Sequence, residues 1–387
     1  MNRYFFRTCL AIFLLMSQIG SPNFAGAYQA SNMLIVTNLN DSGAGSLRQA
    51  VLDAPDGGTI TFAQGLSGSI PLEKPIDLVH NVSINGTGIQ GIIIDGQQKA
   101  GGFFVREMIT VNITNIRFIN SGSTTSSITN VAGFIRLQGD TFYNDNSAFG
   151  GAIYNLFNGT VGIYNSKFEN NNGAFGGAIG NFGITSITNS TFENNKGSIS
   201  NSGALLIAQS TFHNNRNRGI QTVINLYSAQ ATIVNSTFSS NSGAIENSGT
   251  IVSLNTTFYN NSYSGKSSIY NFDIGTMVLK NTIIVSDGRT CEGKVQDGSG
   301  NIQFPGNDCG KAIVVGDPKL YTLSNNGGIT QTMALPPTSI AIKAGSSANC
   351  QDKLLGNVDQ RAVPRESIAN CDAGSFQLNV LPATEAS

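Results

Sequence analysis

Two short motifs that recur along the chain constrain its fold more than any other feature. Residues 165–171 (NSKFENN) return as residues 189–195 (NSTFENN), and degenerate copies begin at positions 209, 235 and 255. The equivalent central position holds Phe in seven successive repeats and Ile in the eighth: Phe118, Phe142, Phe168, Phe192, Phe212, Phe238, Phe258 and Ile284. The spacings between these positions are 24, 26, 24, 20, 26, 20 and 26 residues. A period of this size is typical of a solenoid in which one repeat forms one turn.

A second motif lies between the Phe positions. Residues 150–153 (GGAI) return as residues 176–179, and weaker copies are centred on Ile199, Ile245 and Ile269. Each repeat therefore contains at least two short strands followed by turns, in which Gly is expected to supply backbone angles that a Cβ would forbid. No apolar stripe of period 3.6 is present, which excludes helical and leucine-rich solenoids. The sequence predicts an all-β fold, a right-handed parallel β-helix.

The strand around Phe168 indicates how one coil packs against the next. Side chains on a strand alternate between two faces, so Ser166 and Phe168 should point inward while Lys167 and Glu169 point outward. Stacked coils bury each ring between its neighbours, which contributes roughly 1.5–3 kcal/mol per residue. The Asn that closes each strand is expected to stack and hydrogen-bond with its equivalents in adjacent coils. These residues are Asn171, Asn195, Asn215, Asn241 and Asn261.

The first 27 residues have the pattern of a signal peptide. Arg3 and Arg7 precede a short apolar run at residues 9–16, and small residues follow at positions 25–27. The apolar run is too short for a membrane-spanning helix, so cleavage near Tyr28 is expected. No later stretch is long and apolar enough to cross a bilayer, so we expect a mature chain that is secreted or held at the cell surface without a transmembrane segment.

The mature chain divides into a β-helix with an N-terminal cap at residues 32–285, a C-terminal cap region at 286–380 and a tail at 381–387. Residues 46–52 (SLRQAVL) predict the capping helix, with Ser46 as N-cap and Gln49 completing a capping box. Leu47, Ala50 and Val51 are its expected buried face, which would cover the first coil.

Four cysteines remain after removal of the signal peptide, and all lie beyond Ile284. An even number in an exported chain indicates two disulfides, and proximity favours Cys291–Cys309 with Cys350–Cys371. A zinc site is the alternative, although the cysteine spacings are wrong for paired ligands and the chain has only two His. Nearby, Asp359 and Arg361 are expected to form a buried ion pair that holds the cap.

Composition excludes one class of partner. Charged residues make up 12% of the chain and the formal net charge is −1, whereas nucleic-acid-binding proteins have a basic patch or stripe. We expect no nucleic-acid partner, no cofactor and no bound metal. A polysaccharide or a cell-surface molecule is the possible ligand.

The repeats resemble those of polymorphic outer-membrane proteins, which are exported bacterial β-helices associated with adhesion. The resemblance covers residues 118–284 and is carried by the alternating GGAI and Phe-x-x-Asn motifs. The C-terminal part resembles the choice-of-anchor Q type region of secreted bacterial β-helix proteins. It is carried by residues 326–330 (NGGIT), 341–345 (AIKAG), 359–361 (DQR) and 371–374 (CDAG). Met333 and Lys343 depart from that pattern, which commonly has His and Asp there.

One group of side chains is a weak candidate for catalysis. Glu169, Glu193 and His213 occupy the same outward position after Phe in consecutive coils. Two stacked carboxylates about 5 Å apart would repel, which should raise the pKa of one of them or recruit a cation. The simpler interpretation is a solvated stripe, because outward positions in any repeat stack automatically. A metal-dependent lyase site would need clustered carboxylates, and a hydrolase would need two suitably spaced acids.

Function is therefore not settled by the fold alone. The leading hypothesis is an exported, non-enzymatic protein that acts in adhesion. The alternatives are a carbohydrate-active enzyme, either a polysaccharide lyase or a glycoside hydrolase, and a purely structural matrix component.

Overall fold

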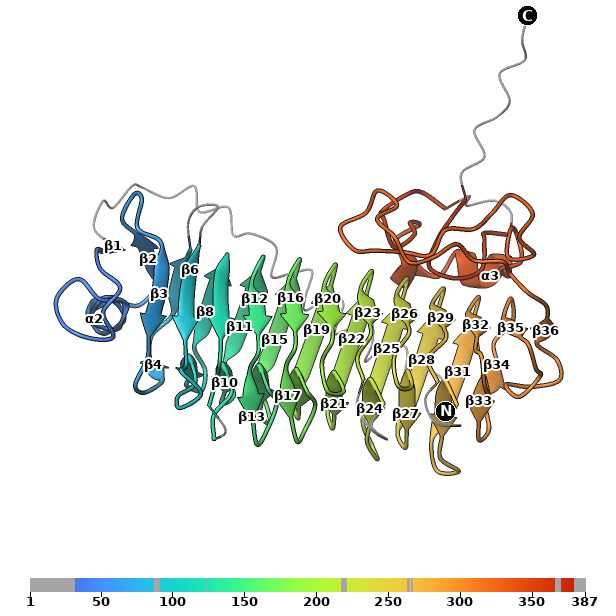
Figure 1. Cartoon of the computed structure of the whole chain (residues 1–387), viewed down its shortest axis with the longest axis horizontal. Helices are drawn as coiled ribbons and strands as arrows, with labels where there is room; N and C mark the ends of the chain where they lie inside the picture. Colours follow the sequence, from blue (N-terminus) through green and yellow to red (C-terminus); the bar gives the residue numbers. More distant parts are fainter. Residues whose placement is uncertain are drawn as a thin grey trace, which may run out of the picture.

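Each coil of the chain places three short strands in three parallel sheets, and the stacked coils form a long rod (Figure 1). The computed structural model describes residues 32–86, 91–122, 124–216, 221–262, 265, 267–365 and 370–378. The predicted signal peptide and the tail from residue 381 lie outside these ranges. Every strand pair between coils is parallel, as a β-helix requires. The predicted right-handed parallel β-helix is confirmed.

Sheet A contains twelve strands: β1 (Met33–Val36), β2 (Gly58–Phe62), β5 (Val82–Asn85), β8 (Thr110–Thr114), β11 (Phe134–Gln138), β15 (Thr160–Tyr164), β19 (Ile184–Thr188), β22 (Ala204–Ala208), β25 (Gln230–Val234), β28 (Thr250–Leu254), β31 (Thr276–Lys280) and β34 (Gln296–Asp297). Sheet B contains twelve: β3 (Gly68–Pro71), β6 (Ile92–Asp95), β9 (Ile116–Ile119), β12 (Thr141–Tyr143), β16 (Lys167–Glu169), β20 (Thr191–Glu193), β23 (Thr211–His213), β26 (Thr237–Ser239), β29 (Thr257–Tyr259), β32 (Ile283–Val285), β35 (Ile302–Phe304) and β36 (Val314–Val315). Sheet C contains ten: β4 (Ile76–Leu78), β7 (Phe103–Val105), β10 (Ile128–Asn130), β14 (Ile153–Asn155), β18 (Ile179–Asn181), β21 (Ile199–Asn201), β24 (Val223–Asn225), β27 (Ile245–Asn247), β30 (Ile269–Asn271) and β33 (Cys291–Glu292). A short extra pair, β13 (Asn146–Ser147) with β17 (Asn172–Gly173), lies between sheets B and C.

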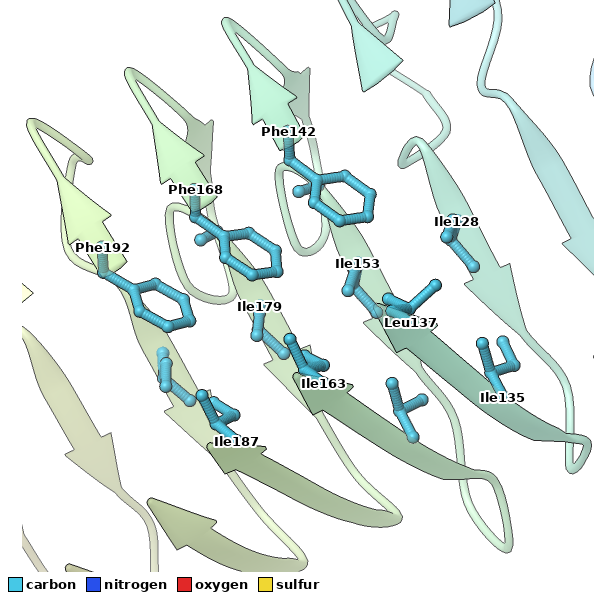
Figure 2. Packing of buried hydrophobic residues seen from close by; sticks show 14 of the residues in the cluster. Ile128, Ile135, Leu137, Phe142, Ile153, Ile163, Phe168, Ile179, Ile187 and Phe192 are labelled. Atoms are coloured by element: carbon cyan, nitrogen blue, oxygen red, sulfur yellow. The ribbon is translucent and has the colours of Figure 1, made fainter. Parts of the chain in front are cut away.

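The Phe residues of sheet B form one continuous stack inside the rod. Strand pairing aligns all eight predicted positions from Phe118 to Ile284 in a single column. The ring centroids of neighbouring Phe residues are 4.5 to 5.1 Å apart, and every ring is fully buried. Figure 2 shows Phe142, Phe168 and Phe192 side by side, with the Ile and Leu side chains of the other sheets packed against them. The repeat read from the sequence is thus the repeat of the core.

The predicted Asn ladder is present beside this stack. Each side-chain amide nitrogen donates to the amide oxygen of the next coil, from Asn171 to Asn195 over 3.0 Å and from Asn195 to Asn215 over 2.9 Å. Asn215, Asn241 and Asn261 continue the series. A second ladder joins the residues that end the sheet C strands, namely Asn130, Asn155, Asn181, Asn201, Asn225, Asn247 and Asn271. Because buried amides must be hydrogen-bonded, the two ladders fix the register of successive coils.

Turns between strands explain two other features of the repeat. Asn165 and Asn189 adopt left-handed backbone angles, which Asn tolerates better than most residues. In the paired-Gly motif only Gly176 has a positive φ, of 90°. At Gly150 the requirement for Gly is steric, because a Cβ there would clash with the carbonyl oxygen of Ile153 at 2.0 Å. The expectation that Gly supplies special angles therefore holds at Gly176, while close contact between backbones explains Gly150.

A short helix covers the first coil, as the sequence predicts. Helix α2 (Leu47–Asp53) buries Leu47, Ala50 and Val51, and Ser46 Oγ accepts from the backbone N–H of Gln49. The reciprocal half of the expected capping box is absent, because the side chain of Gln49 bonds to Asp53. Among the described residues, no helix is both long enough and apolar enough to span a membrane.

The coils continue past residue 286. Strands β33 to β36 add to the three sheets, and the disulfide Cys291–Cys309 brings Cys309 and the neighbouring Ile313 against the end of the core. Residues 316–365 and 370–378, here called the lateral segment, then fold back along the side of the rod (Figure 1). This segment contains α3 (Ser347–Cys350), the 3-10 helix η1 (Lys353–Leu355) and the second disulfide, Cys350–Cys371. Both predicted pairings are confirmed.

Candidate functional site

The three weak catalytic candidates lie in one outward column of sheet B. Strand pairing places Glu169 beside Glu193, and Glu193 beside His213, in the expected register. His213 donates through Nδ1 to the carbonyl oxygen of Ser239, 3.2 Å away, which leaves Nε2 for other partners. The register is therefore as predicted, whereas a catalytic role for these residues stays a prediction.

A cation lies between the two carboxylates. Lys167 Nζ is 2.8 Å from Oε2 of Glu169 and 3.3 Å from Oε2 of Glu193. Partial burial lowers the pKa of Lys167, but the hydrogen bonds and charges of both Glu residues outweigh this effect and raise it. The expected repulsion between the acids is thus offset by a side chain of the same sheet. All three side chains are partly exposed, so solvent weakens these interactions.

The surroundings of this column differ at its two ends. On the N-terminal side, Tyr143 adjoins Glu169, and the guanidinium of Arg117 lies over the Tyr143 ring at 5.1 Å from its centroid. On the C-terminal side, the lateral segment contacts the sheet, because Thr211 Oγ1 donates to the carbonyl oxygen of Gln331 over 2.6 Å. The column is therefore an open strip of mixed charge that the lateral segment borders.

A different face carries a group of exposed aromatic rings around the turns that flank sheet C. This Phe182 cluster consists of Phe149, Tyr154, Phe157, Phe175 and Phe182. Phe182 is at its centre, with ring centroids at 5.4 Å from Phe157, 5.7 Å from Tyr154 and 6.2 Å from Phe175. Phe149 stacks on Tyr154 at 4.7 Å. No member of the cluster is charged.

The repeat itself positions these rings. Tyr154 points outward from β14, and its neighbour in the register of β18 is Gly180, where a Cβ would lie 2.7 Å from the carbonyl oxygen of Phe175 and 3.3 Å from the Tyr154 ring. A larger residue would therefore crowd the ring. Phe182 directly follows the ladder residue Asn181, which fixes the start of its turn. The rings contact one another, yet Phe157, Phe175 and Phe149 remain 65%, 45% and 37% exposed.

A contiguous group of exposed aromatic side chains on a protein surface is uncommon and usually marks a site that binds a ligand or another protein. Sequence reasoning missed this cluster because it followed the inward Phe of each repeat. A signal was present, since Phe182 directly follows the sheet C residue Asn181, and one coil earlier Phe157 lies two positions after the equivalent Asn155. Glycine at position 180, where the preceding coil has Tyr154, was a second sign.

No family model matches this chain, and no curated protein does. The resemblances of the repeats and of the C-terminal region to known families therefore stay predictions. Among solved structures, the chain is similar to pectate lyase Pel9A, with 14% identity and a TM-score of 0.52. The match covers 90% of this chain and 96% of the other. At this identity the likeness shows the shared β-helix fold.

Two further expectations concern metals. The four cysteines beyond Ile284 are all in disulfides, so the zinc alternative is wrong. Within the described ranges, no three side chains of the His, Cys, Asp and Glu types are grouped closely enough to bind a metal ion.

Proposed function

We propose that this chain is an exported, adhesin-like protein that binds a polysaccharide through the Phe182 cluster and does not convert it chemically. The exposed ring faces of that cluster carry the proposal. Pyranose rings have faces made of C–H groups, which pack favourably on aromatic rings, while their hydroxyls remain in water. An uncharged cluster favours sugar rings over charged groups as the contact. The fold shared with a pectate lyase is compatible with a polysaccharide ligand.

The rigidity of the cluster supports the same proposal. The rings are attached to coils whose backbone is held on both sides by ladder hydrogen bonds, and they restrict one another by contact. Binding therefore costs little conformational entropy, because the rings need not be ordered by the ligand. Aromatic side chains that are already fixed are frequent among the residues that dominate binding energy.

Export is supported by the two disulfides, which form and persist in oxidising compartments. The predicted signal peptide agrees with this location. Together these features favour a protein that acts outside the cytoplasm or at the cell surface.

Affinity electrophoresis through gels containing neutral and acidic polysaccharides tests the binding. The mature chain should be retarded by at least one of them, and the double variant Phe157→Ala with Phe175→Ala should lose about tenfold or more in affinity. Tyr321→Ala is the matched control, because Tyr321 is 56% exposed and belongs to the lateral segment. Unchanged retardation of the double variant, with an intact circular dichroism spectrum, contradicts the proposal.

A polysaccharide-degrading enzyme is the second candidate. It is favoured by the stacked Glu169 and Glu193 beside His213 and by the fold shared with a pectate lyase. Incubation with the same polysaccharides separates the two functions. New reducing ends, or new unsaturated products, would support the enzyme, whereas retardation without any product supports the binding protein.

A further inference from the structure

Asp145 occupies a place in the first Asn ladder that the following coils give to Asn. It follows Phe142 by three residues, just as Asn171 follows Phe168. Its backbone N–H donates to Asn171 Oδ1 over 2.9 Å, and its own Oδ1 accepts from the backbone N–H of Ser121 over 2.9 Å. Both contacts repeat those of the true ladder residues, so Asp145 is oriented as they are.

The second carboxyl oxygen of Asp145 therefore stands where the other residues have Nδ2. In Asn171 this nitrogen donates to Oδ1 of Asn195 and to the carbonyl oxygen of Phe142, in the coil before. Asn195 Nδ2 donates to the equivalent acceptors one coil later, which are Oδ1 of Asn215 and the carbonyl oxygen of Phe168. At position 145 the corresponding acceptors are Oδ1 of Asn171 and the carbonyl oxygen of Phe118. Oδ2 of Asp145 is buried and has no hydrogen-bond partner.

A bare carboxylate in this place faces two acceptors in a dry interior, which is unfavourable. A proton on Oδ2 turns the same atom into a donor and completes the ladder. We propose that Asp145 is a neutral acid in the folded chain and that its ionisation acts as a pH-sensitive latch on the segment that follows it. When the proton leaves, the link between the coils of Phe142 and Phe168 weakens at this corner.

The electrostatic surroundings agree with this assignment. Burial raises the pKa of Asp145 to about 7, while the Ser121 N–H and the Ser127 and Ser121 hydroxyls lower it. Neither hydroxyl forms a hydrogen bond with Oδ2, and that of Ser121 donates to the carbonyl oxygen of Gly151. The charge of Asp95, at the end of β6, raises the pKa further. The other charged residues of the flanking sheet B strands are Arg117 on β9 and Lys167 and Glu169 on β16, and all three are on the outward face.

Asp140, before β12, is the second buried carboxyl nearby. Its two oxygens accept from the backbone N–H groups of Ile116 and Gln138, so each oxygen of the carboxylate has a hydrogen-bond donor. Burial raises the pKa of Asp140 well above its ordinary value, while those two bonds lower it. It therefore serves as a control in which the carboxylate, and not the acid, fits the hydrogen-bonding pattern.

The direction in which pH changes the stability follows from the pKa of Asp145 in the folded chain compared with its pKa in the unfolded chain. The folded chain keeps the Asp145 proton up to about pH 7, whereas the unfolded chain releases it near pH 4. The folded state therefore binds more protons across that window, and its stability falls as the pH rises through it. Above the folded pKa the loss is complete and constant. The residues directly affected are Asp145 and the following β13, because Asn172 also donates its N–H to the Asp145 carbonyl.

The variant Asp145→Asn tests the latch. At pH 8.5 we expect it to unfold about 2 °C or more above the natural chain, and at pH 4.5 we expect this gain to disappear. Hydrogen exchange at pH 8.5 should be slower in residues 145–152 of the variant. Asp140→Asn should instead lower the unfolding temperature at pH 8.5, since an amide cannot accept both N–H groups. A difference between Asp145→Asn and the natural chain that is the same at both pH values overturns the proposal.

A measurement on the natural chain keeps the proposal testable if the variant does not fold. Difference infrared spectroscopy should find a carboxylic-acid C=O band that persists above pH 5.5 and disappears near pH 7, and this band should remain in Asp140→Asn, which removes the other buried acid whose pKa burial raises. If Asp145 is ionised at pH 5.5, that band is missing and the latch does not exist.

Discussion

Arg365 in the lateral segment donates from Nη2 to Oδ1 of Asn235, 2.9 Å away and 130 residues earlier in the chain. In return, Asn235 Nδ2 donates to the carbonyl oxygen of Val358 over 2.8 Å. Arg365 also donates to the carbonyl oxygens of Gly374 and Asp372. Burial lowers the pKa of Arg365 to about 10, although nearby carboxylates raise it, so the group is charged at neutral pH. A buried, fully hydrogen-bonded cation thus joins the lateral segment to the coils.

Replacing Arg365 by Met should detach the lateral segment. The change leaves Asn235 Oδ1 buried without a donor and removes one donor each from the carbonyl oxygens of Asp372 and Gly374, to which Asn255 still donates. We expect this loss, together with removal of the buried cation, to cost about 2–4 kcal/mol in the free energy of unfolding. Urea unfolding and limited proteolysis of residues 316–378 measure the effect. Arg289→Met is the control, because that side chain is 61% exposed. Equal protease resistance of the two variants would show that the segment is held elsewhere.

Shortening a ring inside the Phe stack should destabilise the rod. Phe192 is fully buried, with rings on both sides at 4.5 and 4.6 Å. We expect Phe192→Ala to lower the free energy of unfolding by about 3–5 kcal/mol, and Phe192→Leu by less, because the cavity is smaller. Phe134→Ala, on an exposed outward position of β11, should have little effect. Chemical unfolding monitored by circular dichroism compares the three, and similar losses for Phe134 and Phe192 would contradict the packing.

A new carboxyl in the ladder should reproduce the behaviour assigned to Asp145. Asn195 Nδ2 donates to Asn215 Oδ1 and to the carbonyl oxygen of Phe168, so Asn195→Asp places an oxygen against both acceptors. The variant should match the natural chain near pH 4 and lose stability progressively as the pH rises above that. Asn194→Asp is the matched control, because Asn194 Oδ1 only accepts from Asn214. Thermal unfolding from pH 4 to 9 separates them, and a pH-independent loss at position 195 refutes the electrostatic cause.

The disulfides should stabilise different parts of the chain. Cys291–Cys309 closes a loop of 18 residues at the end of the core, and Cys350–Cys371 closes one of 21 residues within the lateral segment. Each is expected to contribute about 3 kcal/mol. The double variant Cys291→Ser with Cys309→Ser should promote aggregation, because the end of the rod loosens. The double variant Cys350→Ser with Cys371→Ser should mainly increase proteolysis of the lateral segment. Light scattering and limited proteolysis distinguish the two variants. Equal aggregation and equal proteolysis of both variants would contradict the prediction that the disulfides stabilise different parts of the chain.

Neutralising the two stacked acids should change little. The double variant Glu169→Gln with Glu193→Gln removes partly exposed ion pairs to Lys167, so we expect a loss below about 1 kcal/mol and unchanged polysaccharide binding. Unfolding curves and affinity electrophoresis measure both quantities. A polysaccharide-degrading activity that disappears in the double variant, with its fold intact, would overturn the non-enzymatic proposal.

The interior of the rod could be predicted because its pattern is local and repeated. A Phe every 20 to 26 residues, with Asn three positions later, leaves parallel stacking as the way to bury the rings, and the structure aligns Phe168, Phe192 and Phe212 as expected. The disulfide pairings followed from proximity in sequence. The buried ion pair of Asp359 with Arg361, at 2.7 Å, was also predicted.

The lateral segment and the candidate surfaces were harder to predict because their contacts are not periodic. Arg365 meets Asn235 across 130 residues, and no local pattern encodes that distance. The bridge from Lys167 to two carboxylates depends on how a flexible side chain is oriented. Asp145 was visible in the sequence as an Asp at an Asn position, but its unpartnered oxygen requires the geometry of the ladder.

The lateral segment also limits how this protein can change in length. It is hydrogen-bonded to one turn residue in each of four successive coils: Gln209, Asn235, Asn255 and Asn281. Duplication or deletion of a whole coil beneath it would move these anchors by one coil spacing, about 4.8 Å, and break the contacts beyond that point. Coils before residue 209 carry no such anchor in the described ranges. Gain or loss of repeats during evolution, and the grafting of new ones by design, should therefore be tolerated between the N-terminal helix and residue 209.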